Sequence, residues 1–234
     1  MKRITQIDPS ARTTVDVADR YYETVHSAFA RDAFLREAPA MTRYGWNRVR
    51  GEYDLGGGFR QSPSAWRFVI SEWVEPADPA TTPRVPAAVM DRLVGDHVNF
   101  MREMRPYDVR ETTLFDARSG QLSLAKFVFT IAEPIADERL HRFAELLGNA
   151  PGARLGLVNQ VIRQAETLPL VEPGQRYGDA FLARPALSHI LELYFDNRDA
   201  GAEFFAGRAV RGLLPAEDGI RGYAVDEWLA FDRR

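Results

Sequence analysis

The chain has 234 residues, of which 45% are hydrophobic, and it carries a formal net charge of −3. These values are typical of a soluble globular protein with one large domain or two smaller ones. No apolar run reaches the roughly 18 residues of a membrane-spanning helix. The acidic balance disfavours nucleic-acid binding, which needs a surplus of Lys and Arg. The absence of cysteine excludes disulfides, thiolate metal sites and a cysteine nucleophile.

The N-terminus and the choice of basic residues add two expectations. Lys2 and Arg3 are followed by no apolar segment, so no cleaved signal peptide is predicted and we expect a cytoplasmic protein. Arginine far outnumbers lysine, because Lys2 and Lys126 are the only lysines of the chain. We interpret this imbalance as a consequence of genome composition rather than of function.

The first part of the chain is predicted to alternate strands and helices in the order β-α-β-β-α-β. Aromatic and β-branched residues predict the strands, and apolar residues three and four apart predict the helices. The first helix is expected to bury a stripe that includes Val17, Val25 and Phe29, with Asp16 as its N-cap. The predicted strands are residues 4–7, 41–49, 66–74 and 109–115, and the predicted helices are residues 17–34 and 87–104.

The same order of elements is predicted to begin again after Ser119 and Gly120. The weakest part of this second series is its second strand, which we place within residues 166–184, after a short helix at residues 155–164. The other predicted strands are residues 124–132, 187–195 and 223–231, and the other predicted helices are residues 137–147 and 200–214.

A ten-residue pattern, V-x-E-x-x-x-F-D-x-R, occurs at residues 109–118 and again at residues 225–234, an offset of 225 − 109 = 116 residues. Because this offset is almost half of the chain, it indicates one fold used twice. We predict two ferredoxin-like repeats, residues 1–118 and 119–234, packed sheet to sheet as an intramolecular α+β barrel. Both copies of the pattern fall on the last predicted strand of a repeat, so we interpret the pattern as structural rather than catalytic.

Several of these segments resemble the EthD-like family of the dimeric α+β barrel superfamily. The resemblance rests on the helix segment 21–29 around His26, on Tyr44-Gly-Trp-Asn47, and on the terminal motifs with Glu111, Phe115-Asp116, Glu227 and Phe231-Asp232. It implies a pocket in each repeat between the sheet and its helices. Relatives use such pockets as cofactor-free monooxygenases, isomerases, cyclases, dehydratases or decarboxylases, and some bind haem. Members are typically single repeats that dimerise, so the doubled chain departs from the family pattern.

His26 is the residue that we expect to carry proton transfer. Histidine is the side chain whose ordinary pKa lies nearest neutrality, and the predicted helix places His26 at the edge of an apolar stripe. Tyr44 and Asn47 are predicted to donate hydrogen bonds to a carbonyl or phenolate oxygen of the substrate. A boundary histidine bonded to a backbone carbonyl is the structural alternative for His26.

A dense set of aromatic residues in the first repeat predicts an apolar pocket for a small molecule. The predicted substrate-binding residues are Tyr21, Tyr22, Trp46, Trp66, Trp73 and His97. We predict an enzyme of the lyase or isomerase class that acts without a cofactor on a small, apolar molecule of aromatic or oxygenated type. In the second repeat, His189 or Glu192 could face a second pocket, although that repeat is expected to serve mainly as a scaffold.

Three alternative hypotheses remain. Glu23/His26 and Glu138/His141 share the E-x-x-H spacing of di-iron bundles, which the alternation of helices with strands disfavours. A haem- or metal-binding oxidoreductase or monooxygenase of the same superfamily is the first alternative function. A non-catalytic small-molecule-binding protein of a catabolic pathway is the second, and a homodimer is compatible with all of these functions.

Overall fold

The computed structural model describes residues 1–10, 13–54, 58–60, 65–74, 86–97, 99–119, 124–164, 168–169, 186–214 and 219–234. We call residues 1–118 the first half and residues 119–234 the second half. The strands are β1 (Lys2–Pro9), β2 (Met41–Asp54), β3 (Gly58–Arg60), β4 (Arg67–Trp73), β5 (Met101–Asp116), β6 (Ala125–Ile131), β7 (Ala153–Gln164), β8 (Leu168–Pro169), β9 (His189–Phe195) and β10 (Arg221–Asp232). The helices are α1 (Val15–Tyr21), the π turn η1 (Tyr22–His26), α2 (Ser27–Glu37), α3 (Ala87–His97), α4 (Asp137–Gly148), α5 (Arg198–Ala206) and α6 (Arg208–Leu213).

The strands form one closed antiparallel barrel. Its order is β1-β4-β2-β10-β6-β9-β7-β5, and β5 pairs with β1 to close the ring, with β3 and β8 as short additions. Within each half, the fourth strand lies beside the first, the third follows and the second ends the row. The halves are joined edge to edge, because β10 pairs with β2 and β5 pairs with β7. The predicted mixed α/β barrel is confirmed.

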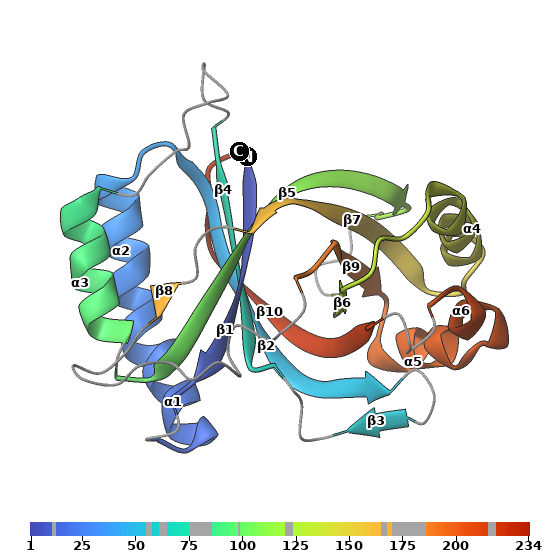
Figure 1. Cartoon of the computed structure of the whole chain (residues 1–234), viewed down its shortest axis with the longest axis horizontal. Coiled ribbons are helices and arrows are strands. Elements are labelled where there is room, and N and C mark those ends of the chain that lie inside the picture. Colours follow the sequence, from blue (N-terminus) through green and yellow to red (C-terminus); the bar gives the residue numbers. More distant parts are fainter. Residues whose placement is uncertain are drawn as a thin grey trace.

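The helices cover the barrel from two opposite sides (Figure 1). Helices α1, α2 and α3 lie against the strands of the first half, and α4, α5 and α6 lie against those of the second half. Alternating strand residues therefore divide into two sets, one facing the helices and one facing the barrel interior. The interior set forms a third buried cluster, which includes Ile4, Val49, Val109, Ile190 and Val225.

The repeated pattern lies on the two strand ends that connect the halves. In β5, Asp116 lies opposite Leu155 of the second half, and in β10, Asp232 lies opposite Arg43 of the first half. Arg118 and Arg234 each turn back onto the aspartate two residues earlier, at 2.7 Å in both copies. The two copies of the pattern therefore lie at equivalent junctions between the halves.

Several predicted elements need correction. Residues 155–164 form a strand and not a helix, so β7 is the second strand of its half, whereas most of residues 166–184 lies outside the described residues. A short apolar run fits a strand as well as a helix, and here pairing with β5 and β9 decides. The helix predicted to reach residue 104 ends at His97, Thr14 rather than Asp16 caps α1, and Gly207 divides the last helical segment.

Candidate active site

A cavity of about 120 Å³ lies between the helices of the first half and the outer face of its strands. An engineered cavity of about 150 Å³ holds benzene, so this space suits a small molecule of about one aromatic ring. Its walls are mostly apolar, with a few polar groups. The lining residues are Arg3, Thr5, Ile7, Tyr22, His26, Ala30, Phe34, Met41, Tyr44, Val69, Ser71, Trp73, Leu93, His97, Met101 and Met104.

The first helical segment reaches this cavity through a polar face. Tyr22 is 0% exposed and His26 is 2% exposed, whereas Val17 and Val25 of the predicted stripe are 57% and 47% exposed. Tyr22 and His26 begin and end the π turn, a wider turn that often occurs at functional sites. The predicted apolar stripe is therefore wrong, because the helix buries the side that carries the histidine.

His26 is held by a carboxylate that the sequence did not single out. Its Nδ1 lies 2.6 Å from Oδ2 of Asp96, on α3, and the Tyr21 hydroxyl donates to Oδ1 of the same carboxylate at 2.5 Å. Burial alone would raise the pKa of Asp96, but the hydrogen bonds from His26 and Tyr21 hold that pKa below its ordinary value. An ionised carboxylate can only accept a hydrogen bond, so Nδ1 of His26 carries the hydrogen. In the neutral ring the nitrogen with a free lone pair is then Nε2.

A second histidine stands beside the first. The ring of His97 lies 4.7 Å from that of His26, centroid to centroid. Burial, and next the neighbouring His26, lower the pKa of His97 to about 3, so its imidazole is neutral near pH 7. Its Nδ1 is buried and has no hydrogen-bond partner among the described residues. His97 thus lines the cavity as predicted, as an uncharged polar group.

Two tyrosines, Tyr22 and Tyr44, add hydroxyl groups to the cavity wall, and the Tyr22 ring lies 5.0 Å from that of His26, centroid to centroid. The Tyr22 hydroxyl is buried and has no hydrogen-bond partner of normal geometry in the described part of the chain. Burial raises the pKa of Tyr22 and also that of Tyr44, so both hydroxyls stay protonated at neutral pH. Buried polar atoms without partners are uncommon, and here Tyr22 and His97 contribute such atoms at one cavity.

The predicted aromatic residues fall into two groups. Trp73 lines the cavity, whereas Trp46 and Trp66 pack against the Tyr22 ring at 5.7 Å and 5.9 Å between centroids and are not part of its wall. Tyr21 reaches the site only through Asp96. Tyr21, Trp46 and Trp66 therefore contact residues of the site without lining the cavity themselves.

Asn47 does not share the site with Tyr44, which corrects the predicted grouping. The two residues are three apart on β2, so strand alternation places them on opposite faces. Asn47 is 1% exposed and lies on the interior face with Arg43 and Val49. In register, Asn47 lies opposite Glu227 of β10. Asn159 of β7 lies opposite Glu111 of β5 in the same way, so Asn159 is the counterpart of Asn47.

Polar residues of the strands also line the cavity. These are Arg3 and Ser71, and neither was predicted. The Arg3 guanidinium lies 5.7 Å from the ring centroid of Trp73, and its Nε donates to Asp108 at 2.7 Å. The wall therefore contains both a histidine held by a carboxylate and a fixed cation.

The second half offers no equivalent group among its described residues. His189 bonds to the neighbouring Ser188 hydroxyl at 3.1 Å, and burial lowers its pKa. Glu192 faces the barrel interior and not a second pocket under the helices. Nowhere in the described ranges do three or more His, Cys, Asp or Glu side chains gather as a metal-binding group. No helix in those ranges is both long enough and apolar enough to cross a membrane.

Sequence comparisons find no matching family model and no matching curated protein. A solved structure described as a putative monooxygenase from Lactobacillus acidophilus NCFM matches with a TM-score of 0.50 at 11% identity, over 99% of this chain and 95% of that one. The fold is that of the dimeric α+β barrels. An anthrone oxidase-like protein matches less closely, with a TM-score of 0.48 at 12% identity over 100% and 94% of the two chains. At these identities the likeness concerns the fold alone.

Proposed function

We propose that the cavity of the first half is the active site of an enzyme that removes a proton from a small aromatic or oxygenated molecule. The observation that carries the proposal is the 2.6 Å contact between His26 and Asp96 at the wall of an apolar cavity. A carboxylate that fixes one imidazole nitrogen orients the other nitrogen and stabilises the imidazolium that forms. His26 is therefore the general base, and Asp96 is its positioning residue.

The charge that develops on the substrate needs donors nearby. Tyr22 and Tyr44 are protonated and line the cavity, so their hydroxyls suit an enolate or phenolate oxygen. Neutral His97 can donate or accept a further hydrogen bond, and Arg3 adds a cation to the wall. The site thus combines one base with several groups that favour an oxyanion.

Oxygenation is the overall reaction that we favour over dehydration, decarboxylation or isomerisation. A solved structure that superposes with a TM-score of 0.50 is described as a putative monooxygenase, and this description favours oxygenation. For a methylene beside a carbonyl, the first proton goes to His26 and the resulting carbanion reduces O2. The methylene becomes a carbonyl that retains one oxygen atom, and the other oxygen leaves as water, which balances the four electrons.

The finer family and fold assignments are part of the same proposal. We infer that each half is one ferredoxin-like unit, since both halves share a strand order and the joint pattern V-x-E-x-x-x-F-D-x-R. Membership of the EthD-like family, the division at residue 118, a cytoplasmic location and a homodimer remain predictions. A haem or metal oxidoreductase remains the alternative function, and a Soret band or stoichiometric metal in the purified protein would favour it.

Deuterium exchange tests proton removal without a known substrate. The probe is 2-indanone, whose methylene protons are acidified by a carbonyl and a benzene ring. In deuterated buffer without O2, NMR should show that the protein accelerates exchange at the methylene.

His26→Gln should lower this acceleration by about 10²-fold or more, the range for a general base. Asp96→Asn should lower it less, with a shifted pH profile. Admission of O2 should then convert the probe to an oxygenated product.

The matched control is His141→Gln, because the His141 side chain is 78% exposed and lies outside the cavity. This variant should exchange the probe at the wild-type rate. An unchanged rate in the His26 variant would contradict the role of His26. Binding of the probe, seen as a raised melting temperature, without any accelerated exchange would favour the non-catalytic alternative.

A further inference from the structure

A second cavity lies at the end of the barrel where the repeated pattern occurs twice. Its volume is about 350 Å³, comparable to many small-molecule sites, and its walls are mainly polar. Glu111 and Arg118 from the first copy of the pattern line it, and so do Glu227 and Arg234 from the second copy. Equivalent residues 116 positions apart therefore meet at one space, as expected near a pseudo-twofold axis.

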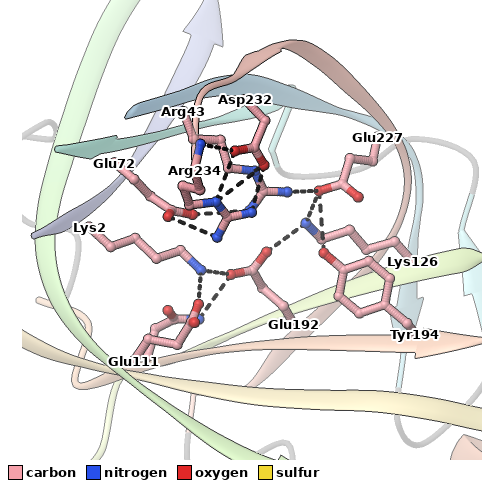
Figure 2. A network of polar contacts seen from close by, with 11 residues as sticks. Lys2, Arg43, Glu72, Glu111, Lys126, Glu192, Tyr194, Glu227, Asp232 and Arg234 are labelled. Atoms are coloured by element: carbon pink, nitrogen blue, oxygen red, sulfur yellow. Dashed lines mark hydrogen bonds and ion pairs between the residues drawn. The ribbon is translucent and has the colours of Figure 1, made fainter. Parts of the chain in front are cut away.

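The two lysines of the chain support this cavity from the barrel interior (Figure 2). Lys2 bonds to Glu111 at 2.5 Å, and Lys126 bonds to Glu227 at 2.7 Å. Both lysines also contact Glu192, which is 1% exposed and lies between them. The symmetric placement of these lysines on the first strand of each half indicates a structural role beyond genome composition.

The lysines determine which charges the cavity offers to a ligand. Glu111 and Glu227 of the wall each pair with a lysine, which offsets part of their negative charge, although both lysines also pair with Glu192. The wall also carries the guanidiniums of Arg43, Arg118 and Arg234, and Glu72 pairs with Arg43 and Arg234.

Arginine matches the geometry of carboxylate and phosphate groups. A guanidinium has five donors, and Asp116 takes two from the Arg118 side chain, which is 55% exposed. Asp232 holds Arg234 in the same way, and that side chain is 52% exposed. Exposed ion pairs of this kind contribute only about 0–1 kcal/mol, so a ligand can compete with them.

We propose that this cavity is a second ligand site, which binds a small organic oxyanion through Arg118 and Arg234. The site is independent of the proposed proton-transfer site, because it lies at the barrel end and not under the helices of the first half. The shared chemistry is an oxyanion of carboxylate or phosphate type. Thr113 and the Tyr194 hydroxyl add neutral polar groups to the same wall.

Isothermal titration at an ionic strength of about 0.15 M tests the site, with succinate and inorganic phosphate as separate probes. We expect one saturable site per chain for at least one probe, and the preferred probe identifies the anion class. Arg118→Gln and Arg234→Gln should each weaken binding about tenfold or more, since each removes charge-assisted hydrogen bonds. Both residues are exposed enough that the variants should keep the wild-type melting temperature within a few degrees.

Two variants serve as matched controls. Arg142→Gln removes an arginine whose side chain is 63% exposed and which pairs with Glu138 outside the cavity, so anion binding should be unchanged. His26→Gln should also bind the anion like the wild type, which separates this site from the proposed active site. Absence of saturable binding by both probes would overturn the proposal, and so would wild-type affinity in the Arg118 and Arg234 variants.

Discussion

The two halves place their helices over the same face of the barrel, and the described residues of the first half line a cavity there, whereas those of the second half pack aromatic rings. In the second half, the rings of Phe127, Phe129 and Phe195 pack around Phe205, with centroids 4.8 to 5.7 Å from it. A Cβ on Gly201 would lie only 2.2 Å from the Phe127 ring, so even a methyl group has no room. The second half is filled to the density of an ordinary core.

The first half buries polar groups at the corresponding position. Tyr22, His26 and His97 are each less than a tenth exposed, and two of them have a polar atom without a partner among the described residues. A buried polar atom without a partner costs about 1–3 kcal/mol, and a ligand that bonds to it would remove this cost. The contrast between the halves therefore supports the proposal that the first half binds a ligand.

The largest expected effect concerns a buried charge of the second half that has an apolar residue as its counterpart in the first half. Glu192 of β9 corresponds in register to Ile70 of β4, yet it holds both lysines. Glu192→Ala should lower the free energy of unfolding by about 3–5 kcal/mol, because it removes the buried carboxylate that both lysines share and leaves each with a single, partly exposed partner. Chemical denaturation measures this change.

Glu138→Ala is the matched control, since its side chain is 76% exposed in a surface pair with Arg142 and should change stability by less than about 0.5 kcal/mol. The lysines hold the pKa of Glu192 below its ordinary value despite burial. Its stabilisation should therefore be present above about pH 4.5 and be lost as the pH falls further. Similar losses in the two variants would show that the interior network is not truly buried.

The next effect is the pH dependence of stability that the buried His97 of the first half should cause. His97 has a pKa of about 3 when folded and about 6.5 when unfolded, so the unfolded chain binds more protons between these values. Stability should therefore fall as the pH drops below about 6.5, by about 3 kcal/mol at pH 4 from this residue. His97→Leu should flatten the slope of unfolding free energy against pH between about 6.5 and 5. His141→Leu, at an exposed site, should leave that slope unchanged.

The fold was largely predictable, because most strands carry their own signal. The apolar and β-branched residues of β6 and β9 and the repeated pattern on β5 and β10 suffice for a doubled α+β barrel. The exception is β7, whose Leu155–Val158 run also fits a helix and becomes a strand only through its neighbours. That error also hid Asn159, the counterpart of Asn47.

The site was predictable only in part. His26 and Tyr44 were found because their residue types suit the chemistry, and Asn47 could have been separated from Tyr44 by strand alternation alone. Asp96 lies 70 residues after His26, and the two meet only because α3 packs beside α2. No local spacing encodes such a contact. The predicted helix stripe was wrong because the buried face mixes alanines with polar residues such as Asp19 and His26, which a hydrophobic pattern does not reveal.

A smaller effect should distinguish the filled half from the open half directly. Gly201→Ala in the second half should lower the unfolding free energy by about 1–3 kcal/mol, since the new methyl group overlaps Phe127. Ala30→Leu in the first half extends into the cavity and should change stability by less than about 1 kcal/mol. The same substitution should abolish the rise in melting temperature caused by an aromatic ligand. A severe loss of stability in Ala30→Leu would mean that the cavity has no usable space.

The smallest effect concerns a glycine beside the proposed active site. Gly95 lies inside α3, next to Asp96, and a Cβ there would meet nothing within 4 Å. Gly95→Ala should raise the unfolding free energy by about 0.5–1 kcal/mol, because alanine has the higher helix propensity. The free space around Gly95 contrasts with the overlap at Gly201, so the same substitution should have opposite signs in the two halves. If α3 must distort for Asp96 to release His26 during catalysis, Gly95→Ala will also slow deuterium exchange of 2-indanone while it stabilises the protein. An unchanged exchange rate would mean that the contact between Asp96 and His26 is rigid throughout the reaction.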